Sequence, residues 1–246
     1  EIVDGVAEEA GVDRAEARIM LDALEADTNR AMEVGYSTNL IVHAFAHSAR
    51  QVGVGQELTA PFFHSMRMDL SETTHTPESF AEYVYGSAEV VGLMCLQAFL
   101  ESQEVTDTQR ETMIRGARAL GAAFQKVNFL RDLGADAQAL GRSYFPDVVV
   151  DELNEDIKNR LLDDINADLA ASAQALPLLP PGPRRAVSLA HALFEALAKR
   201  IRITPAGVLQ TTRISVPTAS KLLLALRVLM GFVPRAPQAL REEHHG

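Results

Sequence analysis

Polar side chains recur at helical spacing in one otherwise largely apolar segment of the chain. Four of them follow one another in steps of three and four residues: Gln125, Asn128, Asp132 and Asp136. Such steps place side chains on one face of an α-helix, each about one turn above the last. The remaining positions, among them Phe129 and Leu130, supply apolar surface. The segment therefore predicts a largely buried helix whose polar face borders a cavity.

The two aspartates of this polar face indicate a cation site. Buried carboxylates lose hydration and repel one another, which raises their pKa unless a cation lies between them. Carboxylate and amide oxygens are the ligands that Mg²⁺ prefers, with water and substrate phosphate completing its shell. An Asp-x-x-x-Asp spacing is also common on a solvated acidic face, so this interpretation depends on the neighbouring sequence.

Helical periodicity runs through the rest of the chain, and no strand alternation of any length is present. Asp13 is a candidate N-cap, and Pro61 suits the first turn of a helix. We predict an all-α single domain over residues 1–233, with about eight helices around a central active-site cavity. A polar tail at 234–246 is expected to be disordered. The main expected helices are 13–34, 40–52, 61–70, 78–100, 109–138, 151–176, 184–202 and 217–232.

Charge and cysteine content narrow the class of protein. The net charge is −10 and no basic stripe is visible, which argues against nucleic acid as a partner. No apolar run approaches the roughly 20 residues that span a bilayer, and no signal peptide opens the chain. The single cysteine, Cys95, excludes an internal disulfide and suits a reducing cytoplasm. We expect a cytoplasmic protein; any contact with a membrane surface would be apolar rather than polybasic.

One further pair of residues has the spacing of metal ligands. Glu72 and His75 are three positions apart, as in di-iron helix motifs. They fall in a Thr-rich loop rather than on a helix, so we do not expect them to bind a metal.

Several ordered motifs resemble those of the squalene/phytoene synthase family. The pattern Asn-x-x-Arg-Asp-x-x-x-Asp at 128–136, followed by Leu-Gly-Arg-Ser-Tyr-Phe-Pro at 140–146, is similar to the second aspartate-rich signature of that family. The opening Glu-Ile-Val-Asp-Gly, which contains Asp4, resembles the tail of the first signature. Segments 65–70 and 83–94 match further family stretches in the expected order. Because the leading aspartate of the first signature would precede residue 1, we expect the natural protein to extend beyond this N-terminus.

The resemblance implies the class I isoprenoid synthase fold and a Mg²⁺-dependent prenyltransferase, with Mn²⁺ as an alternative ion. Family members join two prenyl diphosphates head to head through a cyclopropyl diphosphate. The implied metal ligands are Asp4, Asn128, Asp132 and Asp136. The implied catalytic residues are Asp4, Arg131, Asp132, Asp136 and Tyr144. The implied substrate-binding residues are Gln125, Asn128, Arg131, Arg142 and Phe194.

The chain departs from the family pattern at two positions. Phe194 stands where a tyrosine is common, so an aromatic face remains for a cation while the hydroxyl is lost. Glu89 stands in the expected tunnel helix where glycine is usual, and we consider it a candidate to accept the proton released at the end of the reaction.

Segments 35–40 and 83–94 most resemble bacterial phytoene synthases, which implies two molecules of geranylgeranyl diphosphate as substrates and no need for NADPH. Squalene or dehydrosqualene synthase, using farnesyl diphosphate, is the near alternative. A non-catalytic helical binding module is the distant one. The sequence leaves the oligomeric state open.

Overall fold

The computed structural model describes residues 10–140, 144–146 and 148–235, and for 134–140 the backbone alone. Within these ranges the chain is helical and contains no β-strand. The longer helices are α2 Arg14–Val34, α3 Leu40–Val52, α4 Gln56–Ser71, α5 Pro77–Val84, α6 Val90–Leu100, α7 Asp107–Leu140, α8 Glu155–Ala175, α9 Pro181–Ile203 and α11 Thr218–Leu229. The shorter elements are the π-helical turn η1 Tyr85–Glu89, the 3₁₀ turns η2 Val150–Glu152 and η3 Leu176–Leu178, and the single-turn helix α10 Ala206–Leu209. The predicted all-α class is confirmed.

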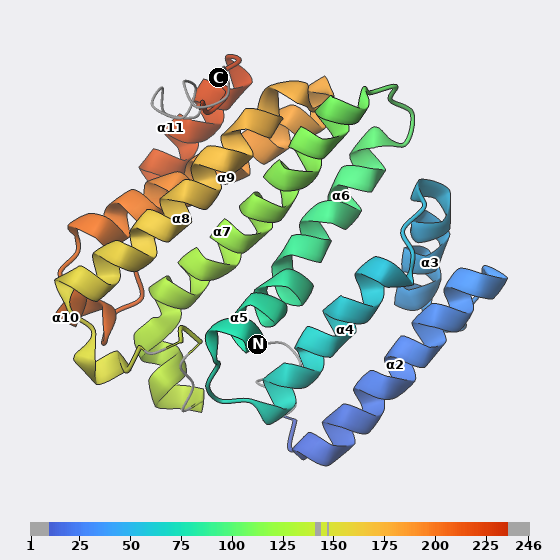
Figure 1. Ribbon diagram of the computed structural model, residues 1–246, viewed down its shortest axis with the longest axis horizontal. Coiled ribbons are helices and arrows are strands. Elements are labelled where there is room, and N and C mark those ends of the chain that lie inside the picture. Colours follow the sequence, from blue (N-terminus) through green and yellow to red (C-terminus); the bar gives the residue numbers. More distant parts are fainter. Residues whose placement is uncertain (1–9, 141–143, 147, 236–246) are drawn as a thin grey trace.

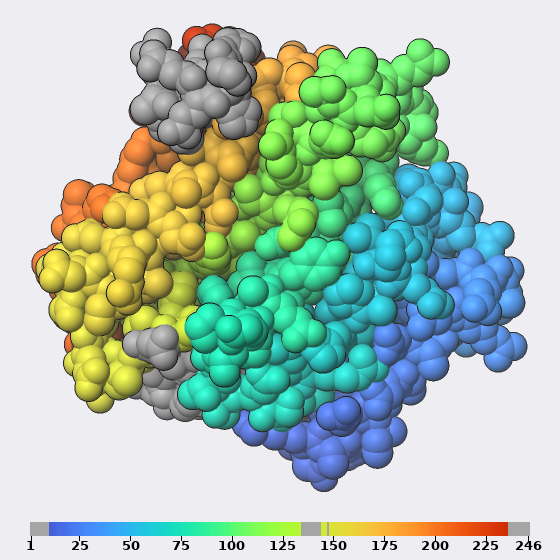
Figure 2. All heavy atoms as spheres, in the orientation of Figure 1, coloured from blue at the N-terminus to red at the C-terminus, as the bar shows by residue number. Residues whose placement is uncertain are grey.

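The helices follow one another across the molecule in nearly their order along the chain. Contacts join α2 to α4, α4 to α6, α6 to α7, α7 to α8, α8 to α9 and α9 to α11, so α2 and α11 lie at opposite edges (Figure 1). The space-filling view shows the same progression from blue to orange (Figure 2). Helix α7 lies in the middle and also contacts α5, η1, α9 and α10. The helix with the predicted polar face is therefore the central one.

Local sequence signals explain most helix ends. The Asp13 carboxylate accepts the backbone N–H of Glu16 at 2.8 Å and caps α2, as predicted. Gly35 closes α2 with a φ of +82°, a left-handed conformation that glycine adopts without steric cost. Asn39 caps α3 through the N–H groups of Ile41 and Val42.

Three helix starts differ from the prediction. Helix α4 begins at Gln56, so Pro61 lies inside the helix rather than in its first turn; burial of Leu58 against α3 and α6 favours the extra turn. Helix α8 begins later than predicted because Asn154 provides its cap. Helix α9 begins earlier because Pro181 occupies its first position, where a missing N–H costs nothing.

The segment predicted as one helix over 78–100 is interrupted by the π-helical turn η1. Gly86 lies in this turn, and a Cβ atom there would be 2.1 Å from the carbonyl oxygen of Pro61 and 2.2 Å from Ser65 Oγ. The Ser65 hydroxyl in turn donates to the carbonyl of Tyr83. Glycine at position 86 therefore lets η1 lie directly against the backbone of α4.

We expect the substitution Gly86→Ala to lower the free energy of unfolding by about 1–3 kcal/mol or more, because the methyl group would meet backbone atoms that cannot move aside. The matched control is Gly182→Ala, where nothing lies within 4 Å of the added Cβ. At this helical position alanine is favoured over glycine by up to about 1 kcal/mol. Urea denaturation of both variants checks this, and equal stabilities would contradict the close contact.

The continuous segment Pro77–Leu100, 24 residues long, is by length and composition apolar enough to cross a membrane. The sequence-based expectation concerned an apolar run, and Glu78, Glu82 and Glu89 interrupt this segment. Its composition also suits a core helix, and α5, η1 and α6 together contact both α4 and α7.

Candidate active site

An apolar cavity of about 460 Å³ lies between the central helix α7 and its neighbours η1, α6, α8, η3 and α9. This volume is typical of small-molecule pockets. On α7 the lining runs along one helical face from Met113 to Phe124, a rise of about 16 Å. The residues that line it are Ser87, Ala88, Val91, Gly92, Cys95, Leu96, Phe99, Met113, Gly116, Ala117, Leu120, Gly121, Phe124, Ser172, Ala175, Leu176, Leu179, Ala186, Val187 and Ala190.

Small residues bring the walls of the cavity together. A Cβ atom on Gly92 would lie 2.5 Å from the carbonyl oxygen of Ala117, and one on Gly121 would lie 2.5 Å from that of Ala88. The helix backbones of η1–α6 and α7 therefore nearly touch on one side of the cavity. Along this side the cavity is lined by small side chains, which leaves room for an apolar ligand.

Large side chains close the cavity at the end farther from the polar face of α7. Met113, Leu176 and Leu179 are almost fully buried there and belong to one hydrophobic cluster. Phe99 and Val187 pack against this cluster. We call this the closed end of the cavity.

At the opposite end, the Phe124 ring stacks on Phe194 of α9, with 3.8 Å between centroids and 19° between the planes. The next helical positions on α7 are Gln125 and Asn128, both half-buried. The apolar cavity and the predicted polar face are thus consecutive along a single helix. Phe194 itself is not among the residues that line the cavity, and its substrate-binding role stays a prediction.

Asp132 lies one turn beyond Asn128 and is almost completely buried between two arginines. Arg131 Nε donates to Asp132 Oδ1 at 3.0 Å, and Arg213 Nε lies 2.7 Å from the same oxygen. The second oxygen, Oδ2, forms an ion pair with Arg131 Nη2 and accepts from Arg213 Nη2 at 3.4 Å. Burial of this carboxylate is therefore compensated by two guanidinium groups.

Arg213 is not among the residues that the sequence predicted for the site. It lies between α10 and α11, 81 positions from Asp132 along the chain. This connection is fixed by Gln210, whose side-chain amide donates to the carbonyl of Val150 at 2.8 Å. Lys158 of α8 also donates to the carbonyl of Thr204 at 2.6 Å. No local motif marks Arg213, so only the fold brings it to Asp132.

The remaining predicted site residues, two metal ligands and one substrate-binding arginine, have no described side chains. Asp4 and Arg142 lie outside the described residues, and the side chain of Asp136 is also outside them, although its backbone continues α7. Among the described side chains, no group of three or more His, Cys, Asp or Glu residues could hold a metal ion. Asn128 and Asp132, one turn apart on α7, provide oxygen donors that suit Mg²⁺. The four-residue metal site stays a prediction.

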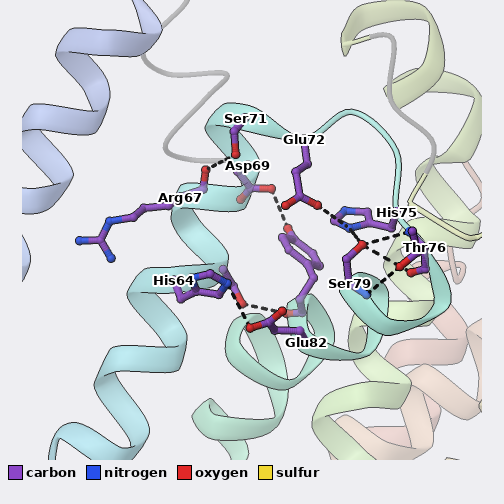
Figure 3. A network of polar contacts seen from close by, with 11 residues as sticks. His64, Arg67, Asp69, Ser71, Glu72, His75, Thr76, Ser79 and Glu82 are labelled. Atoms are coloured by element: carbon purple, nitrogen blue, oxygen red, sulfur yellow. Dashed lines mark hydrogen bonds and ion pairs between the residues drawn. The ribbon is translucent and has the colours of Figure 1, made fainter.

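Tyr144 lies in the hydrophobic core rather than among the residues that line the cavity. Its ring stacks on Phe129 of α7 with 4.0 Å between centroids and on His75 with 6.1 Å. His75 belongs to a polar network in which Glu72 Oε2 and Ser79 Oγ lie 3.3 and 3.2 Å from Nδ1 (Figure 3). These stacks attach residue 144 to α7 directly beside Asn128, and the catalytic role of Tyr144 stays a prediction.

Glu89 does not line the cavity. Its carboxylate accepts from Arg118 Nε at 2.6 Å, and the Arg118 guanidinium lies over the ring of Tyr85. The carboxylate is thus paired with Arg118 and lies outside the cavity lining, and the candidate role of Glu89 as proton acceptor stays a prediction. The neighbouring Ser87 does line the cavity, and its buried hydroxyl oxygen has no hydrogen-bond partner among the residues that the structure describes.

The electrostatics of the cavity wall are those of an apolar environment. Cys95 lines the cavity with its side chain exposed, and desolvation by its neighbours raises the pKa of its thiol, so it is neutral at physiological pH. Near the polar face, Lys126 bridges α7 to Asp164 and Asp168 of α8 at 2.6 and 2.8 Å. Burial opposes the charge of Lys126, but its two carboxylate partners outweigh this effect and raise its pKa.

The geometry can be compared with known proteins. The family model for squalene/phytoene synthases matches residues 1–220, which is most of the chain. The chain belongs to the squalene/phytoene synthase family. A solved structure of squalene synthase HpnC from Alicyclobacillus acidocaldarius is similar, with a TM-score of 0.65 and 22% identity over 76% of this chain and 73% of that one. This likeness confirms the isoprenoid synthase fold.

Two curated relatives of this chain have the words phytoene synthase in their names. The bifunctional lycopene cyclase/phytoene synthase of Leptosphaeria maculans is 26% identical over 183 residues, which is 66% of this chain and 31% of that protein. The chloroplastic phytoene synthase 3 of Zea mays is 42% identical over 84 residues, which is 33% of this chain and 19% of that protein. The chain thus spans less than a third of either relative.

Proposed function

We propose that this protein joins two prenyl diphosphates head to head, and that the substrates are two molecules of geranylgeranyl diphosphate, giving phytoene. The observation that supports this most is the continuity of the apolar cavity with the polar face of α7. A prenyl diphosphate likewise consists of a long apolar chain joined to a charged head. The chain would occupy the cavity while the diphosphate would lie beside Asn128 and Asp132.

The polar end would bind the diphosphate through cations. The guanidinium groups of Arg131 and Arg213 bind the Asp132 carboxylate in the structure. When Mg²⁺ and diphosphate bind, these two side chains would turn to the phosphate oxygens, which planar guanidinium groups bind in a bidentate manner. Asn128 and Asp132, together with the predicted ligands Asp4 and Asp136, would hold Mg²⁺. The ion would neutralise the diphosphate and make it a better leaving group.

The apolar end would protect the reactive cation left by that departure. A prenyl chain bound against this wall of aliphatic and small side chains would displace water, which would otherwise quench an allylic cation. The stacked rings of Phe124 and Phe194 lie where the cavity meets the polar face, and an aromatic face stabilises a nearby cation. The aromatic pair would then lie beside the carbon from which diphosphate leaves.

The names of the two curated relatives favour phytoene, and the structural neighbour is named a squalene synthase, which favours the alternative with farnesyl diphosphate. We choose phytoene because the sequence resemblance at 83–94 and the curated relatives agree. Phytoene formation ends with loss of a proton, so no NADPH is expected, whereas squalene formation needs a hydride.

Parallel assays with geranylgeranyl and farnesyl diphosphate, each with and without Mg²⁺ and NADPH, test the proposal. We expect diphosphate release and a C40 product from geranylgeranyl diphosphate with Mg²⁺ alone, detected by chromatography. Squalene that forms only with NADPH would select the alternative substrate. Binding without any diphosphate release would instead indicate a non-catalytic binding module.

A further inference from the structure

Helix α11 carries a continuous apolar stripe on its outer surface. Its only buried residue is Val228, and its main contact is with α9. The exposed apolar residues recur at helical spacing, and each is more than half exposed: Leu222, Leu223, Leu226, Leu229 and Met230. A helix with this pattern is typical of segments that lie in the plane of a membrane interface.

The charge of the surrounding sequence differs sharply from that of the whole chain. Residues 196–241 contain eight of the 23 Lys and Arg residues and none of the 33 Asp and Glu residues. Lys221 and Arg227 lie on α11 itself and Arg235 follows it, whereas Lys199, Arg202 and Arg213 are paired with Glu195, Asp163 and Asp132. The net charge of −10 conceals this segregation, so no basic stripe was expected from the sequence. The segment complements a negatively charged surface.

A second exposed apolar surface lies at the opposite edge of the molecule, and the sequence around it is acidic rather than basic (Figure 1). Leu40 and Ile41 at the start of α3 are each 81% exposed. The chain from residue 1 to 39 contains ten acidic and three basic residues. An anionic surface would therefore repel the α2–α3 edge and attract the α11 edge, although both expose apolar side chains.

We infer that α11 docks this protein onto a phospholipid bilayer that contains anionic lipids. Twelve residues of helix are about 18 Å long, too short to span the hydrocarbon core but sufficient to lie along its surface. The leucine stripe would enter the acyl boundary, while Lys221 and Arg227 would contact lipid phosphates. Pairing of α11 with a second copy is disfavoured, because it would bring the basic side chains Lys221, Arg227 and Arg235 of two copies together.

The position of α11 also connects the bilayer to the cavity. Its partner α9 contributes Ala186, Val187 and Ala190 to the cavity wall. Val233, just after α11, packs against the cluster at the closed end. If the proposed function holds, docking through α11 would bring the cavity close to the membrane that dissolves a C40 product; the docking itself does not depend on that function.

Co-sedimentation with lipid vesicles tests the inference without any substrate. The vesicles contain either phosphatidylcholine alone or phosphatidylcholine with phosphatidylglycerol. We expect the wild-type chain to bind the anionic vesicles, with affinity that falls as salt rises, and to bind the neutral vesicles weakly. The double variant Leu223→Glu, Leu226→Glu should weaken anionic-vesicle binding by at least about tenfold, because both substitutions place a charge in the apolar stripe.

The matched control is the double variant Leu40→Glu, Ile41→Glu, which changes equally exposed residues at the acidic edge and should bind vesicles like wild type. Circular dichroism confirms that both variants stay folded. Failure of the wild type to bind anionic vesicles, or equal loss in both double variants, would overturn the inference. So would light scattering that shows a wild-type dimer lost only in the α11 variant, since a second copy would then cover the stripe.

Discussion

The substitution Asp132→Asn is expected to lower the rate of diphosphate release from a prenyl diphosphate by at least about a hundredfold. An asparagine keeps the size of the side chain but removes the charge that would hold Mg²⁺ and orient Arg131 and Arg213. Loss of one preorganised electrostatic group from an active site typically costs a factor of about 10²–10³. Release of diphosphate from geranylgeranyl diphosphate, measured with a coupled phosphate assay, checks this expectation.

The matched control for this variant is Asp163→Asn. Asp163 is an exposed carboxylate on α8 that pairs with Arg202, far from the cavity lining. It should retain wild-type activity, since exposed ion pairs contribute little to stability. Circular dichroism should show the same helix content in both variants. If Asp132→Asn were folded and as active as the control, the polar face of α7 would have no part in catalysis.

The second large effect is expected from filling the closed end of the cavity with the substitution Val187→Phe. The larger ring would occupy the space beside Met113 and Leu176, where the end of a long prenyl chain would lie. A C20 chain should therefore lose access before a C15 chain does. We expect the ratio of kcat/KM for geranylgeranyl over farnesyl diphosphate to fall by at least about tenfold, the usual range for a change of shape in a hydrophobic pocket.

Val34→Phe provides the matched control, because Val34 is an exposed residue at the end of α2. The ratio of the two kcat/KM values should not change in this variant. An unchanged ratio in a folded Val187→Phe variant would mean that the prenyl chain does not reach the closed end. A loss of activity with both substrates would mean instead that the chain lies across the cavity near α9.

The sequence was sufficient for the fold because the signals for helices are local. Periodic apolar residues, the cap at Asp13 and the glycine at position 35 mark the ends of α2 within a few residues. The errors arose where tertiary contacts compete with local preference. Burial of Leu58 extends α4 past its proline, and the contact of Gly86 with α4 accompanies the π-helical turn. Neither contact is visible along the chain.

The candidate site also contains residues that could be predicted from the sequence and residues that could not. The polar face of α7 could be predicted, because Gln125, Asn128 and Asp132 are related by the pitch of a single helix. Arg213 could not be predicted, because its approach to Asp132 depends on how α10 and its neighbours pack on α7 and α8. The pairing of Glu89 with Arg118 could not be predicted either, since it joins η1 to α7.

By itself, the sequence determined the all-α class, the family and the helix that carries the polar face, because each depends on residue types at fixed local spacing. The tertiary structure alone decided that the apolar cavity continues from this face and that two arginines enclose Asp132. It also decided that α11 leaves its leucines exposed. These features depend on distances between residues far apart in the chain, and packing of the helices fixes such distances.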